Sequence, residues 1–244
     1  MFELLFELAS NERLKIMLLV EKQELKLSHI SKKLGMTITE ASRHLQRLSE
    51  AKLLEKDVEG LYKLTPFGQL TLSLIPSFDF ISKHRDYFAA HTLSRLPYEF
   101  VGRMGDLANC AFTDDVMVAF HSVENLIEEA KEYVWILSNQ VLMSTLPLLE
   151  KAIKRGVMFQ LIMPEDLTPP AGFKPLPEIF NLIERRTLPR VDLIIAMSEK
   201  QARLSFPTKD DKMDYLGFGS TDERGHRWCR DLFTHYWGEA KHAE

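Results

Sequence analysis

A glycine turn between two helix-spaced runs is the feature that most limits how this 244-residue chain can fold. Apolar side chains in residues 27–34 repeat at helical spacing, and Gly35 follows as the residue type that enters a left-handed turn most readily. Thr37 and Glu40 then form a capping box, in which each side chain can bond the other residue's backbone N–H group. This order predicts two helices joined by a short turn, a helix-turn-helix.

A hairpin is expected directly after the second helix. Residues 53–56 and 61–64 are short strand-like runs, and the four residues between them end in Gly60. A helix-turn-helix followed by a hairpin is the winged form of the motif. We therefore assign residues 1–68 to a winged helix-turn-helix domain.

The second half of the chain alternates between strands and helices. Residues 133–138 and 157–163 have strand character and enclose a helix over 146–155, the order typical of a parallel strand pair. A helix is expected over residues 116–131, before this pair, and a short helix follows the pair. The other expected elements are strands near residues 182–188, 191–197, 202–206 and 215–219, and a closing helix over 221–240 capped by Thr221. The predicted fold class is α+β overall, with an α/β domain over residues 113–244.

A helical connector is expected over residues 69–112. It is more apolar than a solitary surface helix needs to be, so it either packs on its own two domains or forms a dimer contact. Pro76 should end or kink its first helix. Residues 92–112, which contain Pro97 and Gly105, mark the expected boundary between the domains.

The net charge of −4 conceals a local basic segment. Residues 26–56 hold 7 Lys and Arg against 3 Asp and Glu. This segment would therefore attract a polyanion, although the chain as a whole is negatively charged. Only two cysteines occur, acids stand where a secretory signal has basic residues, and the longest uncharged run, 133–149, contains polar side chains. We expect a cytoplasmic, disulfide-free protein without a membrane contact.

Three short stretches resemble prokaryotic winged-helix repressors of the ArsR type: residues 34–37 (LGMT), 42–45 (SRHL) and 64–68 (LTPFG). Nearly the whole chain also resembles archaeal two-domain transcription regulators of the methanogenesis regulatory protein type, through residues 96–100, 134–138, 154–157 and 230–237. This resemblance implies transcription regulation and an effector-sensing second domain similar to the phospholipase-D-like fold. It does not identify the effector.

The second helix of the motif would enter the major groove of double-stranded DNA with its polar side. Arg43 is the best candidate for a bidentate contact with guanine, and Gln46 could read adenine. The full set of expected DNA contacts is Lys32, Lys33, Thr37, Thr39, Ser42, Arg43, Gln46, Arg47, Lys56 and Lys63. The alternative is that these residues form only the solvated face of an amphipathic helix.

The tip of the expected wing, residues 57–60, is acidic and does not suit a phosphate backbone. It favours a rival hypothesis, an adaptor whose winged helix binds a protein partner. The preferred interpretation is a homodimeric regulator whose two recognition helices meet DNA half-sites about 34–36 Å apart.

A small effector would bind beyond the carboxyl ends of the parallel strands, where pockets in α/β domains form. The candidate lining residues are Trp135, Ser138, Asn139, Met163, Arg185 and Arg186, the two arginines as partners of an anion. The alternative for each of them is packing or turn formation.

Phosphodiesterase chemistry of the phospholipase-D kind needs His-x-Lys, and none of the eight histidines has Lys two positions on. We therefore expect no catalytic residues and no cofactor. His226 and Cys229, three residues apart in the closing helix, could supply two zinc ligands, but a third and a fourth are not evident. A metal-sensing repressor is thus the less favoured alternative.

Overall fold

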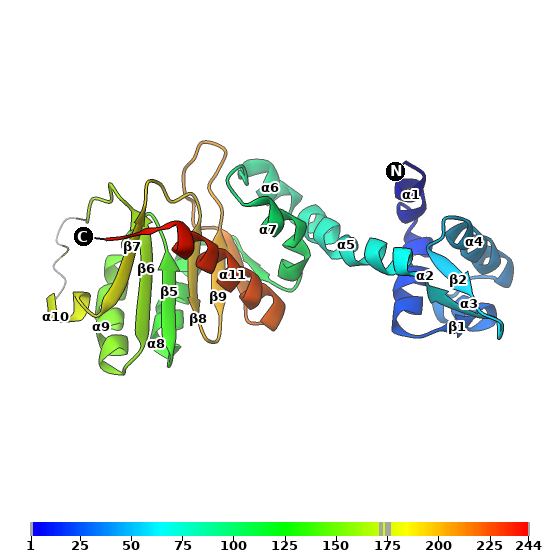
Figure 1. The fold of residues 1–244 in the computed structure, drawn as a ribbon, viewed down its shortest axis with the longest axis horizontal. Coiled ribbons are helices and arrows are strands. Elements are labelled where there is room, and N and C mark those ends of the chain that lie inside the picture. Colours follow the sequence, from blue (N-terminus) through cyan, green and yellow to red (C-terminus); the bar gives the residue numbers. More distant parts are fainter. Residues whose placement is uncertain (1, 171–172, 174–176, 244) are drawn as a thin grey trace. The chain divides into compact units, whose positions relative to one another are not determined.

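The computed structural model describes residues 2–170, 173 and 177–243, and its contacts divide the chain into two units, Met1–Phe78 and Asp79–Glu244. Both units contain helices and strands, which confirms the α+β class (Figure 1). Within the described part of the chain, no helix is long and apolar enough to cross a membrane. Residues 69–78 of the expected connector belong to the first unit, and residues 79–112 belong to the second.

The first unit is a winged helix-turn-helix with one more strand than expected. Its elements are α1 (Phe2–Leu8), α2 (Asn11–Lys22), β1 (Leu25–Lys26), α3 (Leu27–Leu34), α4 (Ile38–Glu50), β2 (Leu54–Lys56), β3 (Leu61–Leu64) and the first part of α5 (Pro66–Lys83). β1 pairs antiparallel with β3, which gives the sheet order β1-β3-β2. A two-residue strand is too short for its alternation to be recognised in a sequence. Ile16, Ile30, Leu45, Leu48 and Leu53 are fully buried in the core of this unit.

The two turns of the motif have the geometry that their residues predict. Gly35 follows α3 at φ 66°, and Gly60 ends the wing turn at φ 83°, both in the left-handed region. The Thr37 hydroxyl accepts from the Glu40 N–H at 3.2 Å, and the Thr37 N–H donates to the Glu40 carboxylate at 3.0 Å, so the capping box is confirmed. The start of α4 is thereby fixed, and with it the face that α4 presents to solvent.

The second unit is built on a mixed sheet, which has eight strands among the described residues. Its elements are α6 (Arg85–Ala90), α7 (Tyr98–Gly102), the 3-10 helix η1 (Met104–Leu107), β4 (Ala111–Thr113), α8 (Val116–Glu129), β5 (Tyr133–Leu137), the 3-10 helix η2 (Met143–Thr145), α9 (Leu146–Lys154), β6 (Met158–Pro164), α10 (Pro177–Phe180), β7 (Ile183–Leu188), β8 (Ile194–Ser198), β9 (Ala202–Ser205), β10 (Gly217–Ser220), α11 (Glu223–Glu239) and β11 (Lys241–His242). The strand order is β11-β7-β6-β5-β8-β9-β10-β4. β5, β6 and β7 run parallel, which confirms the expected parallel pair, and the remaining neighbours pair antiparallel.

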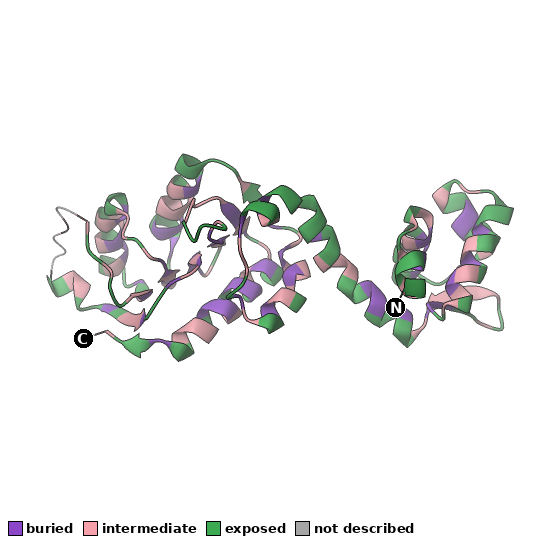
Figure 2. Ribbon diagram, turned by 90° about the horizontal axis from the view of Figure 1, so that it is seen from above, coloured by how far each residue is buried: buried purple, intermediate pink, exposed green. Residues whose placement is uncertain are grey.

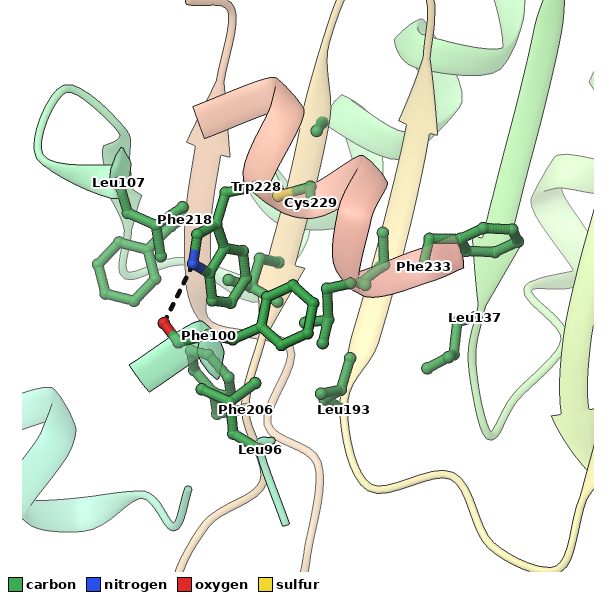
Figure 3. Packing of buried hydrophobic residues seen from close by; sticks show 14 of the residues in the cluster. Leu96, Phe100, Leu107, Leu137, Leu193, Phe206, Phe218, Trp228, Cys229 and Phe233 are labelled. Atoms are coloured by element: carbon green, nitrogen blue, oxygen red, sulfur yellow. Dashed lines mark hydrogen bonds between the residues drawn. The ribbon is translucent and has the colours of Figure 1, made fainter. Parts of the chain in front are cut away.

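Helices cover both faces of this sheet. α11 packs on β8 and β9, whereas α8 and α9 lie on the opposite face (Figure 1). Alternation along β5 divides its side chains, because Val134 and Ile136 join the cluster with α8 and α9 while Leu137 joins the cluster with α11. The helices are accordingly buried on one side and exposed on the other (Figure 2). In the α11 cluster, the fully buried Trp228 donates its indole N–H to the Phe100 carbonyl at 3.3 Å (Figure 3).

The structure bears on two expected helix boundaries. At Pro76, where an end or a kink was expected, the helix does not end. α5 continues through Pro76, and the side chains of Leu72 and Phe80 on either side are buried, which stabilises a helix that has lost one backbone donor. α11 is capped by Asp222 rather than Thr221. The Asp222 carboxylate accepts from two backbone N–H groups of the first turn, at 2.9 and 3.1 Å, and a carboxylate also suits the positive end of the helix dipole.

Residues 92–112, the expected domain boundary, instead form part of the core of the second unit. Pro97 and Gly105 stand in a segment of short helices, and such residues are compatible with an irregular but buried stretch. The buried side chains of this segment are Leu96, Phe100, Met104, Leu107 and Cys110. The turn-forming residues of this segment therefore indicate irregular local structure and not the boundary between the two units.

Candidate nucleic-acid interface and effector cavity

The outward faces of α3 and α4 together carry most of the residues expected to contact DNA. Ala41, Leu45 and Leu48 are buried, so the opposite face of the helix is turned to solvent. The expected contact residues exposed there are Thr39, Ser42, Arg43 and Gln46, at helical spacing and beside the exposed Glu40. Lys32 and Lys33 are exposed in the last turn of α3. Six of the ten expected contact residues are thus exposed on these two helices.

The side chains of Thr37 and Gln46 already have hydrogen-bond partners, whereas the Arg43 guanidinium has none among the described residues. The Thr37 hydroxyl belongs to the capping box, and Gln46 donates to the Glu50 carboxylate at 2.9 Å. The bonds that Thr37 donates to Glu40 hold the pKa of that carboxyl below its usual range. Arg43 forms neither a hydrogen bond nor an ion pair with any residue that the structure describes, so its guanidinium is available to an outside partner.

Arg47 is held by α1 instead of facing outward. Its guanidinium forms two bonds with the Glu7 carboxylate, at 2.5 and 3.2 Å, and lies over the Phe6 ring at 5.1 Å from the centroid. Glu7 is buried and also pairs with Arg13 at 2.8 Å. The hydrogen bond with Glu7 raises the pKa of Arg47 above its ordinary value. The expected phosphate contact is therefore occupied within the unit, by a partner too distant in sequence for helix-face reasoning to find.

The wing offers fewer free cations than its sequence suggests. Lys63 lies 3.2 Å from the Glu55 carboxylate on the paired strand, and this contact raises the pKa of the Lys63 ammonium. Lys56 is exposed, with its ammonium 5.6 Å from the centroid of the Tyr62 ring. Asp57 accepts from two backbone N–H groups of the turn, at 2.9 and 2.8 Å. One acid of the wing tip thus serves the turn itself.

A cavity of about 100 Å³ lies between the sheet of the second unit and α8. Ser138 and Met163, two of the six residues expected to line an effector pocket, do line it. The apolar part of the lining comes from both layers and includes Ala119, Phe120, Val123, Ile136, Leu142, Leu149, Leu161, Ile194, Ala196, Leu204 and Phe218. The cavity therefore suits an apolar body, with a few polar groups at its margin.

The other four expected residues lie elsewhere. Trp135 points to the opposite face of the sheet, where its ring stacks on Phe233 at 5.1 Å, because neighbouring residues of a strand alternate in direction. Asn139 borders a separate hollow of about 750 Å³. Arg185 lies over the Phe180 ring at 4.0 Å. Arg186 lies over Trp237 at 4.4 Å and donates to the Trp237 carbonyl at 2.7 Å. Both arginines are therefore used in packing and do not line the cavity under α8.

Among the polar lining residues that sequence reasoning missed, Arg203 and Tyr215 have the most distinctive chemistry. Arg203 comes from β9, a strand that pairs antiparallel with β8 and lies away from the parallel strand ends. Tyr215 precedes β10 and has a left-handed backbone, with φ 64°. The signal for Arg203 was a lone charge in an otherwise uncharged strand, which stands out once that strand is placed in a buried sheet.

His226 and Cys229 do not share a metal-binding arrangement with other ligands. The His226 Nε2 lies 2.6 Å from the Ser198 carbonyl, and Cys229 is buried. Among the residues that the structure describes, no group of three His, Cys, Asp or Glu side chains could hold a metal ion.

Comparisons with known proteins identify the motif of the first unit. Residues 10–56 match the family model for bacterial regulatory proteins of the arsR family. No curated protein sequence matches the chain. Among solved structures, the chain is similar to TrmBL2, described as an archaeal chromatin protein with a novel mode of DNA binding, at 12% identity over 90% of this chain and 88% of that one, with a TM-score of 0.44.

Two further structures are similar to the chain. One is Nuc from Salmonella typhimurium, a phospholipase D family member, at 12% identity over 56% of this chain and 97% of that one, with a TM-score of 0.40. The other is IdeR from T. acidophilum, at 15% identity over 89% of this chain and 96% of that one, with a TM-score of 0.26. The family match places an ArsR-family helix-turn-helix in the N-terminal part of this chain.

Proposed function

We propose that this chain is a homodimeric transcription regulator that binds double-stranded DNA through its first unit and a small effector through its second. The observation that carries the proposal is the arsR-family match over residues 10–56, within which α4 presents the unpaired Arg43 to solvent. The basic excess of residues 26–56 supports the same partner, because a local cluster of cations attracts a polyanion whatever the net charge of the chain.

The proposed roles follow from side-chain chemistry. Arg43 reads a guanine through its planar fork, and Ser42 and Thr39 contact a base or a phosphate beside it. Lys32 and Lys33 contact the phosphate backbone as point charges. Gln46 reads adenine only after it exchanges its bond with Glu50 for a bond with the base. Its contribution should therefore be smaller than that of Arg43.

The test begins with selection of duplexes from a random pool by the full-length protein. On the selected duplex, Arg43→Ala should weaken binding by about 1–3 kcal/mol and relax the preference at one base pair. The double variant Lys32→Ala/Lys33→Ala should weaken binding to all duplexes alike. It should also reduce the slope of log affinity against log salt concentration by the amount expected for about two phosphate contacts. Arg224→Ala, which removes an exposed arginine of α11, is the matched control and should change neither quantity.

Two results would count against this proposal. An affinity that does not fall as salt rises would exclude direct DNA binding, because neutralising phosphates always releases counterions. That result would favour the adaptor hypothesis, for which the fully exposed Val58 at the wing tip is the specific observation. An unchanged affinity and base preference in Arg43→Ala would instead show that the recognition role assigned to Arg43 is wrong.

Dimerisation is proposed from an exposed apolar stripe on α5. Phe67, Leu70, Leu74 and Phe78 are 46%, 70%, 56% and 65% exposed and follow one another at intervals of three or four residues. An apolar helix stripe of this kind is typical of an interaction surface. A second copy of the chain is the proposed occupant, since two recognition helices are needed to reach two half-sites of an operator.

A further inference from the structure

We propose that the cavity under α8 binds a short-chain carboxylate, with Arg203 as its counter-ion and the Tyr215 hydroxyl as a second donor. The inference rests on the effector-sensing role proposed above and names the chemical class of the effector. It depends on three features of the cavity: its apolar lining, an arginine without an anion, and a tyrosine held in an unfavourable backbone conformation.

The lining selects a ligand with one charge. Arg203 is the only charged residue among the described residues that line the cavity, and most of the others are aliphatic or aromatic. A dianion such as phosphate would need several more donors than one guanidinium and a few hydroxyls can supply. A monoanion with an apolar body satisfies both the charge and the surface.

Arg203 is placed for an anion that the chain does not provide. Its guanidinium donates to the Thr113 hydroxyl at 3.1 Å, and no carboxylate of the described residues lies within 4.0 Å of it. Burial lowers the pKa of Arg203, and no opposite charge offsets this effect. Gly219 stands opposite Arg203 across the strand pair, and a Cβ there would lie 2.8 Å from Arg203 Nη1. The glycine thus leaves room beside a partly desolvated cation that no carboxylate of the described residues neutralises, which is unfavourable until an anion binds.

Tyr215 supplies the second donor. Its hydroxyl oxygen is buried and has no hydrogen-bond partner among the described residues, although buried hydroxyls nearly always have one. Its ring meets Phe120 of α8 edge to face, at 5.0 Å between centroids. Its φ of 64° is uncommon for a bulky residue, and such conformations concentrate at ligand sites.

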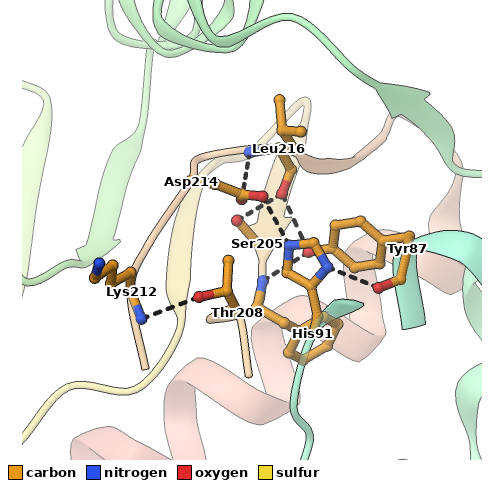
Figure 4. Close-up of polar contacts among 8 residues, drawn as sticks. Tyr87, His91, Ser205, Thr208, Lys212, Asp214 and Leu216 are labelled. Atoms are coloured by element: carbon orange, nitrogen blue, oxygen red, sulfur yellow. Dashed lines mark hydrogen bonds and ion pairs between the residues drawn. The ribbon is translucent and has the colours of Figure 1, made fainter. Parts of the chain in front are cut away.

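Both neighbours of Tyr215 are tied down, which maintains its conformation (Figure 4). Asp214 contacts the His91 ring at 2.8 Å and accepts from the Leu216 N–H at 3.0 Å. The Leu216 carbonyl accepts from the Tyr87 hydroxyl at 3.1 Å and from the Ser205 hydroxyl at 2.6 Å. The backbone around Tyr215 is therefore fixed by side chains from α6 and β9 before any ligand arrives.

The volume limits the length of the ligand. An apolar cavity of about 150 Å³ holds benzene, so a cavity of about 100 Å³ admits an apolar body of roughly four carbons. With the carboxyl carbon at Arg203, the best ligand should have about four to six carbons in all. Longer chains would require α8 to move away from the sheet.

The test uses the full-length protein and calorimetric titration with unbranched carboxylates from acetate to octanoate. The matching primary amides and inorganic phosphate serve as comparison probes. Affinity should be highest near four to six carbons, and the amides and phosphate should bind at least tenfold more weakly. Arg203→Gln should lower the affinity of the best acid by tenfold or more, and Tyr215→Phe by roughly threefold to tenfold. Arg224→Gln, at an exposed position of α11, is the matched control and should leave the affinities for the acids and for the amides unchanged.

A second readout does not depend on a ligand. Because Arg203→Gln removes an unpaired charge, the ligand-free variant should melt at the same temperature as the wild-type protein or higher, as followed by tryptophan fluorescence. Arg203→Lys, which keeps the charge but loses the planar fork, should retain part of the affinity even if the glutamine variant fails to fold.

Equal affinity for acid and amide, or no binding by any acid of the series, overturns the inference. Binding to the selected duplex is measured on the same preparation. If the duplex binds and no acid does, this ligand class alone is excluded. If acids bind as expected and no duplex is ever selected, the ligand class stands and the proposed regulation of DNA binding fails.

Discussion

The guanidinium of Arg47 in α4 and the carboxylate of Glu7 in α1 form a two-point ion pair, at 2.5 and 3.2 Å, between residues 40 positions apart. Glu7 has a second partner in Arg13 of α2, at 2.8 Å, and both of these side chains are 8% exposed. One carboxylate therefore holds together three helices of the winged helix-turn-helix, including the proposed recognition helix. The pair also explains why a short N-terminal helix remains packed on the unit.

Removing Glu7 should destabilise the first unit strongly. Glu7→Ala leaves Arg13 buried without its counter-ion, and breaking a buried pair in this way costs about 3–5 kcal/mol. All three tryptophans, at positions 135, 228 and 237, lie in the second unit. Urea unfolding followed by helical circular dichroism should show an earlier transition, whereas the tryptophan fluorescence transition should stay in place. Glu12→Ala is the control, because its 3.7 Å pair with Lys15 is exposed and contributes about 0–1 kcal/mol. Equal effects of the two variants would contradict the role given to Glu7.

The capping box should stabilise α4 by a measurable amount. Thr37→Ala removes the hydroxyl that accepts from the Glu40 N–H, and loss of such a cap costs about 1 kcal/mol. Thr37→Ser keeps the hydroxyl and should restore most of that stability. The same circular dichroism transition measures both variants. A serine variant no more stable than the alanine variant would show that the hydroxyl is not what matters at this position.

The sequence predicts the helix-turn-helix well because its signals are local. Gly35 and the Thr37–Glu40 box act within one turn of chain, so neighbouring residues suffice to place both helix ends. The Arg47–Glu7 pair is different, because it depends on how α1 folds back on α4. The helical spacing shows on which side of α4 Arg47 lies. It does not show which other element packs against that side.

The cavity under α8 could be predicted only in part for a related reason. Ser138 and Met163 were expected because they lie at the carboxyl ends of the parallel strands β5 and β6, and both line this cavity. The prediction for Trp135 was wrong because it placed this residue on the cavity face of β5. In a strand buried on both faces, the sequence does not show which of two neighbouring residues points to a given face. Arg203 reaches the cavity from the antiparallel strand β9 and Tyr215 from the segment before β10, and the position of these strands in the sheet order is not encoded locally. Sheet order and the covering helix decide the composition of this site.

A close approach at Gly68 provides a further test of the first unit. A Cβ on Gly68 would lie 2.1 Å from the Leu53 carbonyl oxygen. With alanine at position 68, α5 and the start of the wing would therefore have to move apart. Gly68→Ala should destabilise the unit by about 1–3 kcal/mol, measured by the circular dichroism transition. Gly238→Ala is the matched control, since a Cβ on this α11 glycine meets nothing within 4 Å. That control should stabilise by up to about 1 kcal/mol, because alanine is the better helix former. A harmless Gly68→Ala would mean that the two segments separate easily.

The proposed dimer should dissociate when charge is placed on its stripe. Leu70→Glu/Leu74→Glu puts two carboxylates on the exposed apolar face of α5, where a partner copy would have to desolvate them. Sedimentation of the full-length protein should then report a monomer, and affinity for a two-half-site duplex should fall while a single half-site still binds weakly. Gln69→Glu, on the opposite side of the same helix, should remain a dimer. A wild-type protein that sediments as a monomer at micromolar concentration would exclude this interface.

The two cysteines should be unreactive in the folded protein. Burial raises the pKa of the Cys110 thiol to about 11 and also raises that of Cys229. Since the thiolate is the reactive form, alkylation at pH 8 should be roughly a hundredfold slower in the native state than in denaturant. The raised pKa of Cys110 also makes the free energy of unfolding depend on pH. The contribution of this thiol to stability is complete below the ordinary thiol pKa of about 8.5. It declines as pH rises towards about 11, because the thiol ionises at lower pH in the unfolded chain than in the folded protein. Mass spectrometry of labelled peptides measures the first effect, and rapid native labelling of Cys110 would show that this part of the core opens readily.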